Sequence, residues 1–434
     1  MAREKKEAAL TPEERLQAAL VPDWEWPYKL PGNWCWTTVG AINQYVGISA
    51  DPTKAKNKTF ELYSVPSSAD NYPEIVLGAD IGSTKQSVKK GDVLLCKINP
   101  RINRVWKVSK YTDHSLLASS EWIVIRNSGL ISNYLMWCFR SPYFRGYMLS
   151  NVSGVGGSLM RAQPKFVQGY PVPVPPLPEQ QRIVDRIESL FSKLDEAKEK
   201  AQAVVDSFET RKAAILHKAF TGELTAKWRE EHGVSIDNWK TTRFDSVAAI
   251  RSNLVDPAEY QSFPHIAPDN IEKKTGVLLE YHTIAEDGVT SGKHRFYSGQ
   301  ILYSKIRPYL SKAVVVDFDG LCSADMYPIE AYQNARCLWY YMLSDEFLLQ
   351  ASTAGSRSVL PKINQKELSA LTVHLPTNDR EQEEIARILD ELFDKEQQTK
   401  EAAEAVLDQI DLMKKSILAR AFRGELGTND PSEE

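Results

Sequence analysis

Apolar residues along Glu179 to Leu224 recur at alternating steps of four and three, the spacing of one continuous stripe on a long helix. The pattern returns 202 residues later, along Glu381 to Leu426. A period of 3.5 residues kept over five heptads favours two helices that pack on each other, whereas a helix covering its own domain drifts towards 3.6. The stripe, here called the seam, consists of Ile183, Ile187, Leu190, Leu194, Ala201, Val204 and Phe208 in the first helix and Ile385, Leu389, Leu392, Ala403, Val406 and Ile410 in the second.

The helices belong to a longer internal repeat. Gly91 to Arg104 returns 208 residues later as Gly299 to Lys312. A unit of about 200 residues is long for a solenoid repeat and suits a duplicated domain followed by a helix. Short β-rich runs bounded by Gly, Asn, Asp or Pro dominate each block upstream of its helix. We therefore predict an α+β protein with two similar domains, two long helices and an internal pseudo-twofold repeat.

The predicted division has six segments. They are an N-terminal extension at 1–26, a first domain at 27–178, a first long helix at 179–224, a second domain at 225–376, a second long helix at 377–426 and a C-terminal tail at 427–434. The five cysteines show no CxxC or Cys/His spacing, so we expect reduced thiols. No apolar stretch is long enough to span a membrane, and the charged N-terminus does not resemble a secretory signal. We expect a cytoplasmic protein.

Charge is distributed unevenly along the chain, although the net charge is only minus 4. Residues 27–176 hold 17 Lys and Arg against 8 Asp and Glu, residues 241–376 hold 13 against 15, and residues from 377 onward hold 8 against 16. An excess of cations is what a phosphate-binding surface requires, and a merely solvated basic face is the alternative. The first domain is therefore the stronger candidate for binding nucleic acid.

The densest basic cluster lies between residues 97 and 110, where Lys and Arg are interleaved with Asn. Cations neutralise backbone phosphates, while Arg and Asn can bond to guanine and adenine edges in the major groove. The repeat of this cluster keeps several cations but replaces Asn99 and Arg101 with Arg307 and Tyr309. This indicates two modules that hold DNA alike and read different bases. The alternative is a basic hairpin edge that discourages aggregation.

A second paired candidate is a loop of small residues in each domain, at 153–158 and 352–357. Glycine lets a backbone approach a phosphate closely, although turn formation is an equally good explanation. Basic residues accompany both loops. Together the two kinds of cluster give the predicted DNA-binding residues, which are Lys97, Asn99, Arg101, Asn103, Arg104, Lys107, Arg161, Lys165, Lys305, Arg307, Tyr309, Lys312, Arg357 and Lys362.

Catalytic motifs are missing from the sequence. There is no GxxxxGK[ST] phosphate loop, no HExxH metal motif, no GxSxG nucleophile elbow and no Asp/Asn-Pro-Pro-Phe/Tyr motif of an amino-methyltransferase. The histidines are scattered and none forms a pair at metal-ligand spacing. We therefore predict a chain that is not an enzyme and holds no metal, so that any catalysis belongs to a partner.

The chain consists of a β-rich module and a long helix ending in Phe-x-Gly-Glu-Leu, followed by a second copy of both. This order resembles the specificity subunit of type I restriction-modification systems. The resemblance covers nearly the whole chain after residue 26. It is carried by Pro175 to Ile183 and Ala219 to Leu224, with weaker second copies at Leu375 to Ile385 and Ala421 to Leu426. It implies two target-recognition domains that each read one half of a bipartite, asymmetric DNA site and are held apart by an antiparallel coiled coil.

The resemblance also implies partners. These are double-stranded DNA, two copies of an adenine-N6 methyltransferase subunit and two copies of an ATP-dependent translocase and nuclease subunit. S-adenosylmethionine, ATP and Mg are then expected in the partner subunits and no cofactor in this chain. The N-terminal extension, the inserted Asn378-Asp379 and the second domain, which is not basic, depart from the family pattern. The main alternative function is a non-catalytic coiled-coil scaffold that binds proteins and no DNA.

Overall fold

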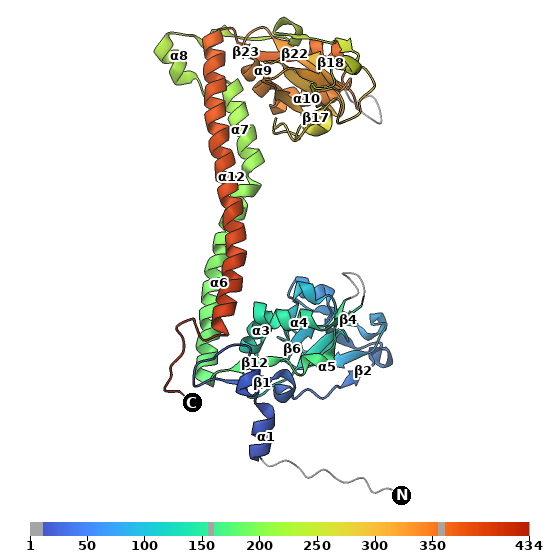
Figure 1. Cartoon of the computed structure of the whole chain (residues 1–434), viewed down its shortest axis with the longest axis vertical. Helices are drawn as coiled ribbons and strands as arrows, with labels where there is room; N and C mark the ends of the chain where they lie inside the picture. Colours follow the sequence, from blue (N-terminus) through green and yellow to red (C-terminus); the bar gives the residue numbers. More distant parts are fainter. Residues whose placement is uncertain (1–11, 155–159, 355–360, 434) are drawn as a thin grey trace. The chain divides into compact units, whose positions relative to one another are not determined.

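The computed structural model describes residues 12–154, 160–354 and 361–433. The chain forms two compact units, one made of Met1–Lys200 with Val406–Glu434 and the other of Ala201–Ala405. Each unit contains one β-rich domain together with parts of both long helices (Figure 1). Among the described residues, no helix combines the length and the apolar character that crossing a membrane requires.

The domain of the first unit is built around two sheets. The larger sheet has the order β2 (Ser49–Ala50), β5 (Lys85–Ser87), β8 (Ser115–Ala118), β3 (Thr59–Tyr63), β4 (Glu74–Leu77), with β3 and β8 parallel. The smaller sheet has the order β7 (Val105–Lys107), β6 (Val93–Cys96), β9 (Trp122–Ile125). Two strand pairs and two main helices complete the domain, namely β1 (Cys35–Thr38) with β12 (Pro171–Val174), β10 (Val152–Ser153) with β11 (Arg161–Ala162), α3 (Ser132–Arg140) and α4 (Pro142–Ser150).

Strand β6 separates two cores in this domain. All four of its residues are buried, and successive side chains of a strand point to opposite faces. Val93 and Leu95 belong to the core that includes α3 and the long helices, whereas Leu94 and Cys96 belong to the core that includes β3 and β8. An apolar run without polar alternation therefore marks a strand that is covered on both faces.

The domain of the second unit repeats this plan. One sheet has the order β14 (Ala248–Ile250), β22 (Met326–Ala331), β19 (Ile301–Ser304), β20 (Ala313–Val315). The other has the order β15 (Leu254–Val255), β18 (Lys293–Phe296), β21 (Gly320–Cys322), β16 (Pro264–Ile266), β17 (His282–Thr283), with β16 and β21 parallel. The remaining main elements are β13 (Trp239–Arg243), which pairs with β23 (Thr372–Pro376), and helices α9 (Ala335–Met342), α10 (Asp345–Ala354) and α11 (Gln365–Ala370). The predicted α+β architecture with an internal repeat is confirmed.

The first long helix is interrupted, which differs from the predicted unbroken stripe. It forms α6 (Leu177–Asp206) and α7 (Phe208–Phe220), whereas the second long helix is the single α12 (Asp379–Ala421). At the break, the Ser207 hydroxyl donates to the Ala203 carbonyl oxygen at 2.6 Å and accepts from the Arg211 guanidinium. A serine that bonds back to the preceding turn bends a helix, which accounts for the interruption. The division into six segments stays a prediction.

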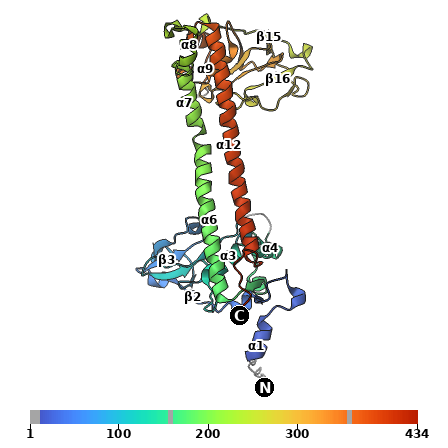
Figure 2. The same cartoon turned by 90° about the vertical axis from the view of Figure 1, so that its left-hand side faces the viewer.

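The two long helices run in opposite directions where they meet within each unit (Figure 2). The contacts that define the direction are Asp195–Lys414 and Lys198–Asp411 in the first unit, and Phe208–Lys400 and Arg211–Glu396 in the second. In both units the residue number falls along one helix as it rises along the other. The packing is therefore antiparallel, as the resemblance implied.

The seam needs one correction, at Val406. The buried or half-buried seam residues are Ile183, Ile187, Leu190, Leu194, Ala201, Val204, Phe208, Ile385, Leu389, Leu392, Ala403 and Ile410. Val406, however, is 40% exposed, and Met413 further along the same line is 49% exposed. Leu407 and Lys414 are half-buried in their place. A straight helix has 3.6 residues per turn, so its buried stripe drifts away from a strict 3.5-residue repeat and moves by one position.

The end of each long helix completes the core of the unit in which it finishes. Ala421 at the end of α12 is buried in the core of the first unit, where Phe422 directly after it lies 5.3 Å from Tyr134 between ring centroids. Phe220 at the end of α7 is buried in the core of the second unit and lies 5.0 Å from Tyr341. Each core therefore contains the start of one long helix and the end of the other.

This arrangement predicts which unit each helix end stabilises. We expect Phe422→Ala to lower the unfolding free energy of the first unit by about 3 to 5 kcal/mol, because a buried ring is replaced by a cavity. Phe220→Ala is the matched variant for the second unit. Hydrogen exchange measured by mass spectrometry should show faster opening of β6 and β9 in the first variant and of β19 in the second. Equal loosening of both units by either variant would contradict the assignment.

Candidate nucleic-acid interface

The basic cluster of the first domain forms a tight loop between β6 and β7. A short 3-10 turn at Pro100–Ile102 is bracketed by Asn99 and Asn103, whose φ angles of 47° and 52° lie in the left-handed region. Asparagine tolerates this region better than most residues. The bracketing turns the backbone sharply, so that Arg101 and Ile102 are exposed at the tip.

This loop lies directly against the second predicted candidate, the hairpin of β10 and β11. The Asn99 amide donates to the Met160 carbonyl oxygen at 2.8 Å, and the Ala162 amide donates to the Lys97 carbonyl oxygen at 2.8 Å. We call residues 97–104 and 160–165 the first loop pair. Two clusters that are about sixty residues apart in the sequence thus form one surface. Residues 155–159 of the small-residue loop lie outside the described residues.

The second domain builds the same frame with other side chains. The Arg307 amide donates to the Pro361 carbonyl oxygen at 2.7 Å, and the Ile363 amide donates to the Lys305 carbonyl oxygen at 2.9 Å. Arg307 and Ser311 bracket the turn Pro308–Leu310 with φ angles of 49° and 46°. We call residues 305–312 and 361–365 the second loop pair. Arg357 lies outside the described residues.

The left-handed backbone is less natural for Arg307 and Ser311 than for the two asparagines. Non-glycine residues in this region, apart from Asn and Asp, store strain that persists where the surroundings fix the conformation. Here the fixing contacts are the two hydrogen bonds to residues 361–363 and the Ser311 amide, which donates to the Pro308 carbonyl oxygen at 2.9 Å. Strain of this kind often accompanies binding loops, and here the surrounding contacts hold the second loop in the shape that the first domain obtains with asparagine.

The tips present different side chains at matched positions. Arg101 and Arg307 are exposed, and Tyr309, which matches Arg101, is 47% exposed. Lys97 and Arg104 are half-buried, and Lys165 is exposed with its ammonium 4.8 Å from the centroid of the Phe166 ring. Asn99 is half-buried, and its side-chain oxygen is buried without a hydrogen-bond partner. The exposed positions are therefore better placed for base reading than Asn99.

Three predicted DNA-binding side chains are instead bound within the protein. Asn103 donates its side-chain amide to the Arg140 carbonyl oxygen at 3.1 Å, and the Lys107 ammonium donates to the Asn133 side chain at 2.5 Å. Lys312 is only 15% exposed in its side chain and donates to the Pro268 carbonyl oxygen at 2.7 Å. These bonds support the shape of the loops, and DNA binding by the three side chains stays a prediction.

Each loop pair is also contacted by an acidic residue that the sequence analysis missed. Glu121 lies 3.4 Å from Arg161, and Asp325 lies 3.3 Å from Lys362 and 3.8 Å from Lys305. The two acids occupy matched positions, since their carbonyl oxygens accept from the Lys97 and Lys305 amides respectively. Both acids directly precede a buried strand, β9 or β22, and this common position was the available signal. A carboxylate here orients the cation and disfavours a phosphate placed at the same point.

Two titratable groups beside the loops are uncharged near neutral pH. Burial raises the pKa of the Cys96 thiol, at the end of β6. Burial, followed by the charge of Lys305, lowers the pKa of His294 in the second domain. The charge of both loop pairs therefore comes from Lys, Arg and the paired acids.

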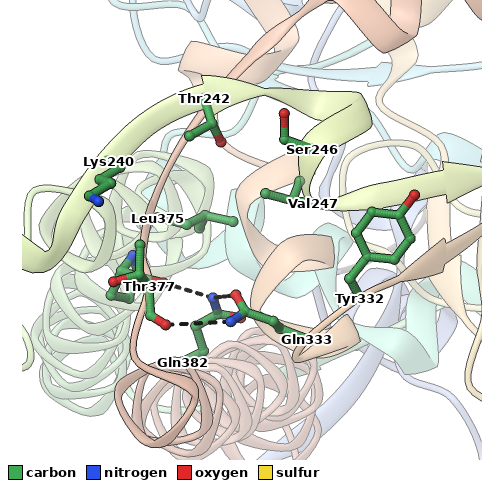
Figure 3. A pocket seen from close by; sticks show the side chains of 10 residues that line it. Lys240, Thr242, Ser246, Val247, Tyr332, Gln333, Leu375, Thr377 and Gln382 are labelled. Carbon is green, nitrogen blue, oxygen red and sulfur yellow. Dashed lines mark hydrogen bonds between the residues drawn. The ribbon is translucent and has the colours of Figure 1, made fainter.

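A pocket in the second unit is lined by residues outside these loops. It has a volume of about 300 Å³ and is lined by β13, β23 and the start of α12, including Lys240, Tyr332 and Gln382 (Figure 3). Gln382 donates to the Gln333 side chain at 2.6 Å and to the Pro376 carbonyl oxygen at 2.8 Å, which fixes the entry of α12. None of the predicted DNA-binding residues lines this pocket. No group of three or more His, Cys, Asp or Glu within residues 12–154, 160–354 and 361–433 could hold a metal ion.

The cations of the first loop pair predict a salt-dependent interaction with duplex DNA. We expect Lys97→Ala and Arg161→Ala each to weaken binding at every sequence and to reduce the slope of log affinity against log salt by about 1, because each releases about one fewer counterion. Affinity would be measured over a salt series. Lys54→Ala, which removes an exposed lysine outside the loop pair, is the control. An unchanged slope in both variants would place the phosphate contacts elsewhere.

The sequence is similar to known proteins. The family model of the type I restriction modification DNA specificity domain matches residues 48–205 and 236–407. The chain is 36% identical to the specificity subunit of the Escherichia coli type I restriction enzyme EcoDI, over 75% of this chain and 76% of that protein. It is 24% identical to the EcoKI specificity subunit of Escherichia coli strain K12, over 70% and 68% respectively.

Two solved structures share the fold. A chain from a type I R-M system superposes with a TM-score of 0.72 at 20% identity, covering 92% of this chain and 100% of that chain. The HsdS subunit from Thermoanaerobacter tengcongensis superposes with a TM-score of 0.63 at 20% identity, covering 93% and 100%. The chain belongs to the family of type I restriction-modification DNA specificity subunits.

Proposed function

We propose that each domain reads one half of a bipartite, asymmetric DNA site through its loop pair. One observation carries this proposal. Both loop pairs have the same backbone hydrogen bonds and the same left-handed brackets, but different side chains at the tip. A common frame can place both tips in a groove in the same way, while Arg101 in one domain and Tyr309 in the other meet different base edges. Because the two tips carry different side chains on the same backbone frame, the two halves of the DNA site differ in sequence.

The two domains differ in how much they contribute to affinity. Residues 27–176 carry 17 Lys and Arg against 8 Asp and Glu, whereas residues 241–376 carry 13 against 15. In the second loop pair, moreover, Asp325 engages both Lys305 and Lys362. The first domain therefore supplies most of the phosphate attraction, and the second depends on the assembled complex for tight binding.

This chain recognises the DNA sequence, and the partner subunits catalyse methylation and cleavage. It docks two copies of an adenine-N6 methyltransferase subunit and two copies of an ATP-dependent translocase and nuclease subunit in the cytoplasm. S-adenosylmethionine, ATP and Mg act in those partners. The absence of nucleotide, metal and methyltransferase motifs from the sequence supports this division of labour.

A coiled-coil scaffold without DNA binding is the rival function. A gel shift with duplex DNA, run over a salt series with the methylation subunit present, separates the two. Sequence-specific retention that weakens with salt supports the recognition subunit. Retention of the partner subunit with no retention of DNA would support the scaffold.

The loop tips predict separate effects on the two half-sites. We expect Arg101→Ala to relax discrimination only in the first half-site, and Tyr309→Ala only in the second, by about 1 to 3 kcal/mol each. Methylome sequencing of cells that carry each variant with its partner subunits measures both half-sites at once. Lys54→Ala again serves as the control. Loss of discrimination in both half-sites from a single substitution would refute separate reading.

The antiparallel helices predict a fixed spacer between the half-sites. Seven residues inserted after Ala197 and seven after Asp411 lengthen both helices by about 10 Å, since a helix rises 1.5 Å per residue. We expect the permitted spacer to grow by about 3 base pairs while both half-sites stay the same. The methylome of the double insertion measures this. If the half-sites changed and the spacer did not, the helices would not set the distance.

A further inference from the structure

A buried lysine on a long helix contacts the second domain next to its loop pair. Lys212 of α7 is 8% exposed. Its ammonium donates to the carbonyl oxygens of Lys274 at 2.6 Å and Thr275 at 3.3 Å, and lies 5.6 Å from the centroid of the Phe393 ring. A lysine is rarely buried unless its charge is satisfied, so these contacts fix both the ammonium and the turn it holds.

The turn that Lys212 holds is itself tightly fixed. We call residues 272–277 the wedge turn; it is closed by the Glu272 amide donating to the Val277 carbonyl oxygen at 3.0 Å. Gly276 has a φ of 77°, and a Cβ atom at this position would lie 2.2 Å from the Trp339 ring. Only glycine fits there, so the wedge turn packs closely against α9.

The wedge turn reaches the loop pair through the same residue that Lys212 holds. The Lys274 amide donates to the Leu310 carbonyl oxygen at 3.1 Å, while its own carbonyl oxygen accepts from Lys212. Leu310 follows directly on Tyr309, the exposed residue at the tip. A continuous path of two hydrogen bonds therefore joins helix α7 to the tip of the second loop pair.

A small cavity lies along this path. It has a volume of about 100 Å³, and its lining includes Lys212, Lys274 and Ser311. The Ser311 hydroxyl is buried and has no hydrogen-bond partner. The left-handed backbone of Ser311 thus has no hydrogen bond from its own hydroxyl, and the wedge turn behind it is one of the supports of the loop.

The matched lysine of the other long helix makes different contacts. Lys414 stands 202 residues after Lys212, pairs with Asp195 of α6 and lies 5.2 Å from the centroid of the Phe191 ring. The first loop pair is held instead by α3 and α4, because Arg140 donates to the Val105 carbonyl oxygen at 2.7 Å and Arg145 to the Arg101 carbonyl oxygen at 2.5 Å. The path that joins a long helix to a loop tip, from α7 through Lys274 to Leu310, therefore belongs to the second domain.

We propose that Lys212 is a positioning residue for base recognition by the second loop pair, acting through the Lys274 peptide on the tip at Tyr309. The inference rests on the proposed function, because it assigns the second half-site to this loop pair. A residue of the long helix then sets how sharply the second half-site is read. The first half-site is independent of it.

The test substitutes Lys212 in the full chain, expressed with its partner subunits, and reads the methylome. Lys212→Met keeps the length of the side chain but leaves two buried carbonyl oxygens unpaired. We expect discrimination in the second half-site to fall by about tenfold while the first half-site is unchanged. Lys212→Arg, which can still donate to both carbonyl oxygens, should restore discrimination. Lys218→Met, which removes an exposed lysine of the same helix, should leave both half-sites unchanged.

The outcomes separate this inference from the proposed function. If the wild-type chain gives a bipartite motif and Lys212→Met gives the same motif with the same discrimination, the positioning role is wrong and separate reading survives. If the wild type recognises no bipartite motif, the proposed function itself fails. Thermal unfolding identifies a variant that does not fold. In that case Lys212→Gln takes its place, because its amide nitrogen is one atom closer to the backbone and does not reach both carbonyl oxygens; an unchanged second half-site in that variant also overturns the inference.

Discussion

The structure depends on each long helix having a single apolar stripe that must be covered along its whole length. The antiparallel partner covers the stripe, and the β-rich domains cover its ends. Ile183 and Ile187 at the start of one helix share a core with Leu418 and Phe422 at the end of the other. Because neither helix can bury its stripe without the other, the folding of both domains is tied to helix pairing.

Buried carboxylates mark the points where each helix enters its domain. Glu179 is fully buried, and its carboxylate accepts from Arg182 at 2.8 Å and from Thr428 of the C-terminal tail at 2.7 Å. Glu381 is fully buried at the matched position, where Arg229 and Thr225 both donate to it at 2.8 Å. Thr428 in the tail after the second long helix therefore donates to the buried Glu179, just as Thr225 after the first long helix donates to the buried Glu381. Such charges are costly to bury unpaired, so they help to fix the register of each helix start.

The sequence was sufficient for the repeat, the fold class and the two helices, because these depend on periodicities that many residues share. It failed at Val406 and at Ser207, where the drift of a straight helix and one side-chain hydrogen bond decide the outcome. For the candidate site, composition pointed to both loop pairs, but it did not reveal that Lys312 and Lys107 donate hydrogen bonds within the protein. Whether a lysine faces solvent or a carbonyl oxygen depends on neighbours that are distant in the sequence, such as Pro268. No local pattern contains that information.

The two loop pairs share one backbone frame and can still read different DNA. The parts that fix the frame are backbone groups, such as the amides of residues 99 and 307, and these are independent of side-chain identity. The tip side chains are exposed and contribute little to folding, so they can vary without loss of stability. The support behind each frame has also diverged, since Arg140 holds the Val105 carbonyl oxygen in one domain and Trp339 holds the Ala313 carbonyl oxygen in the other. Specificity in this chain can therefore change at two levels, through the tip and through the groups that hold it.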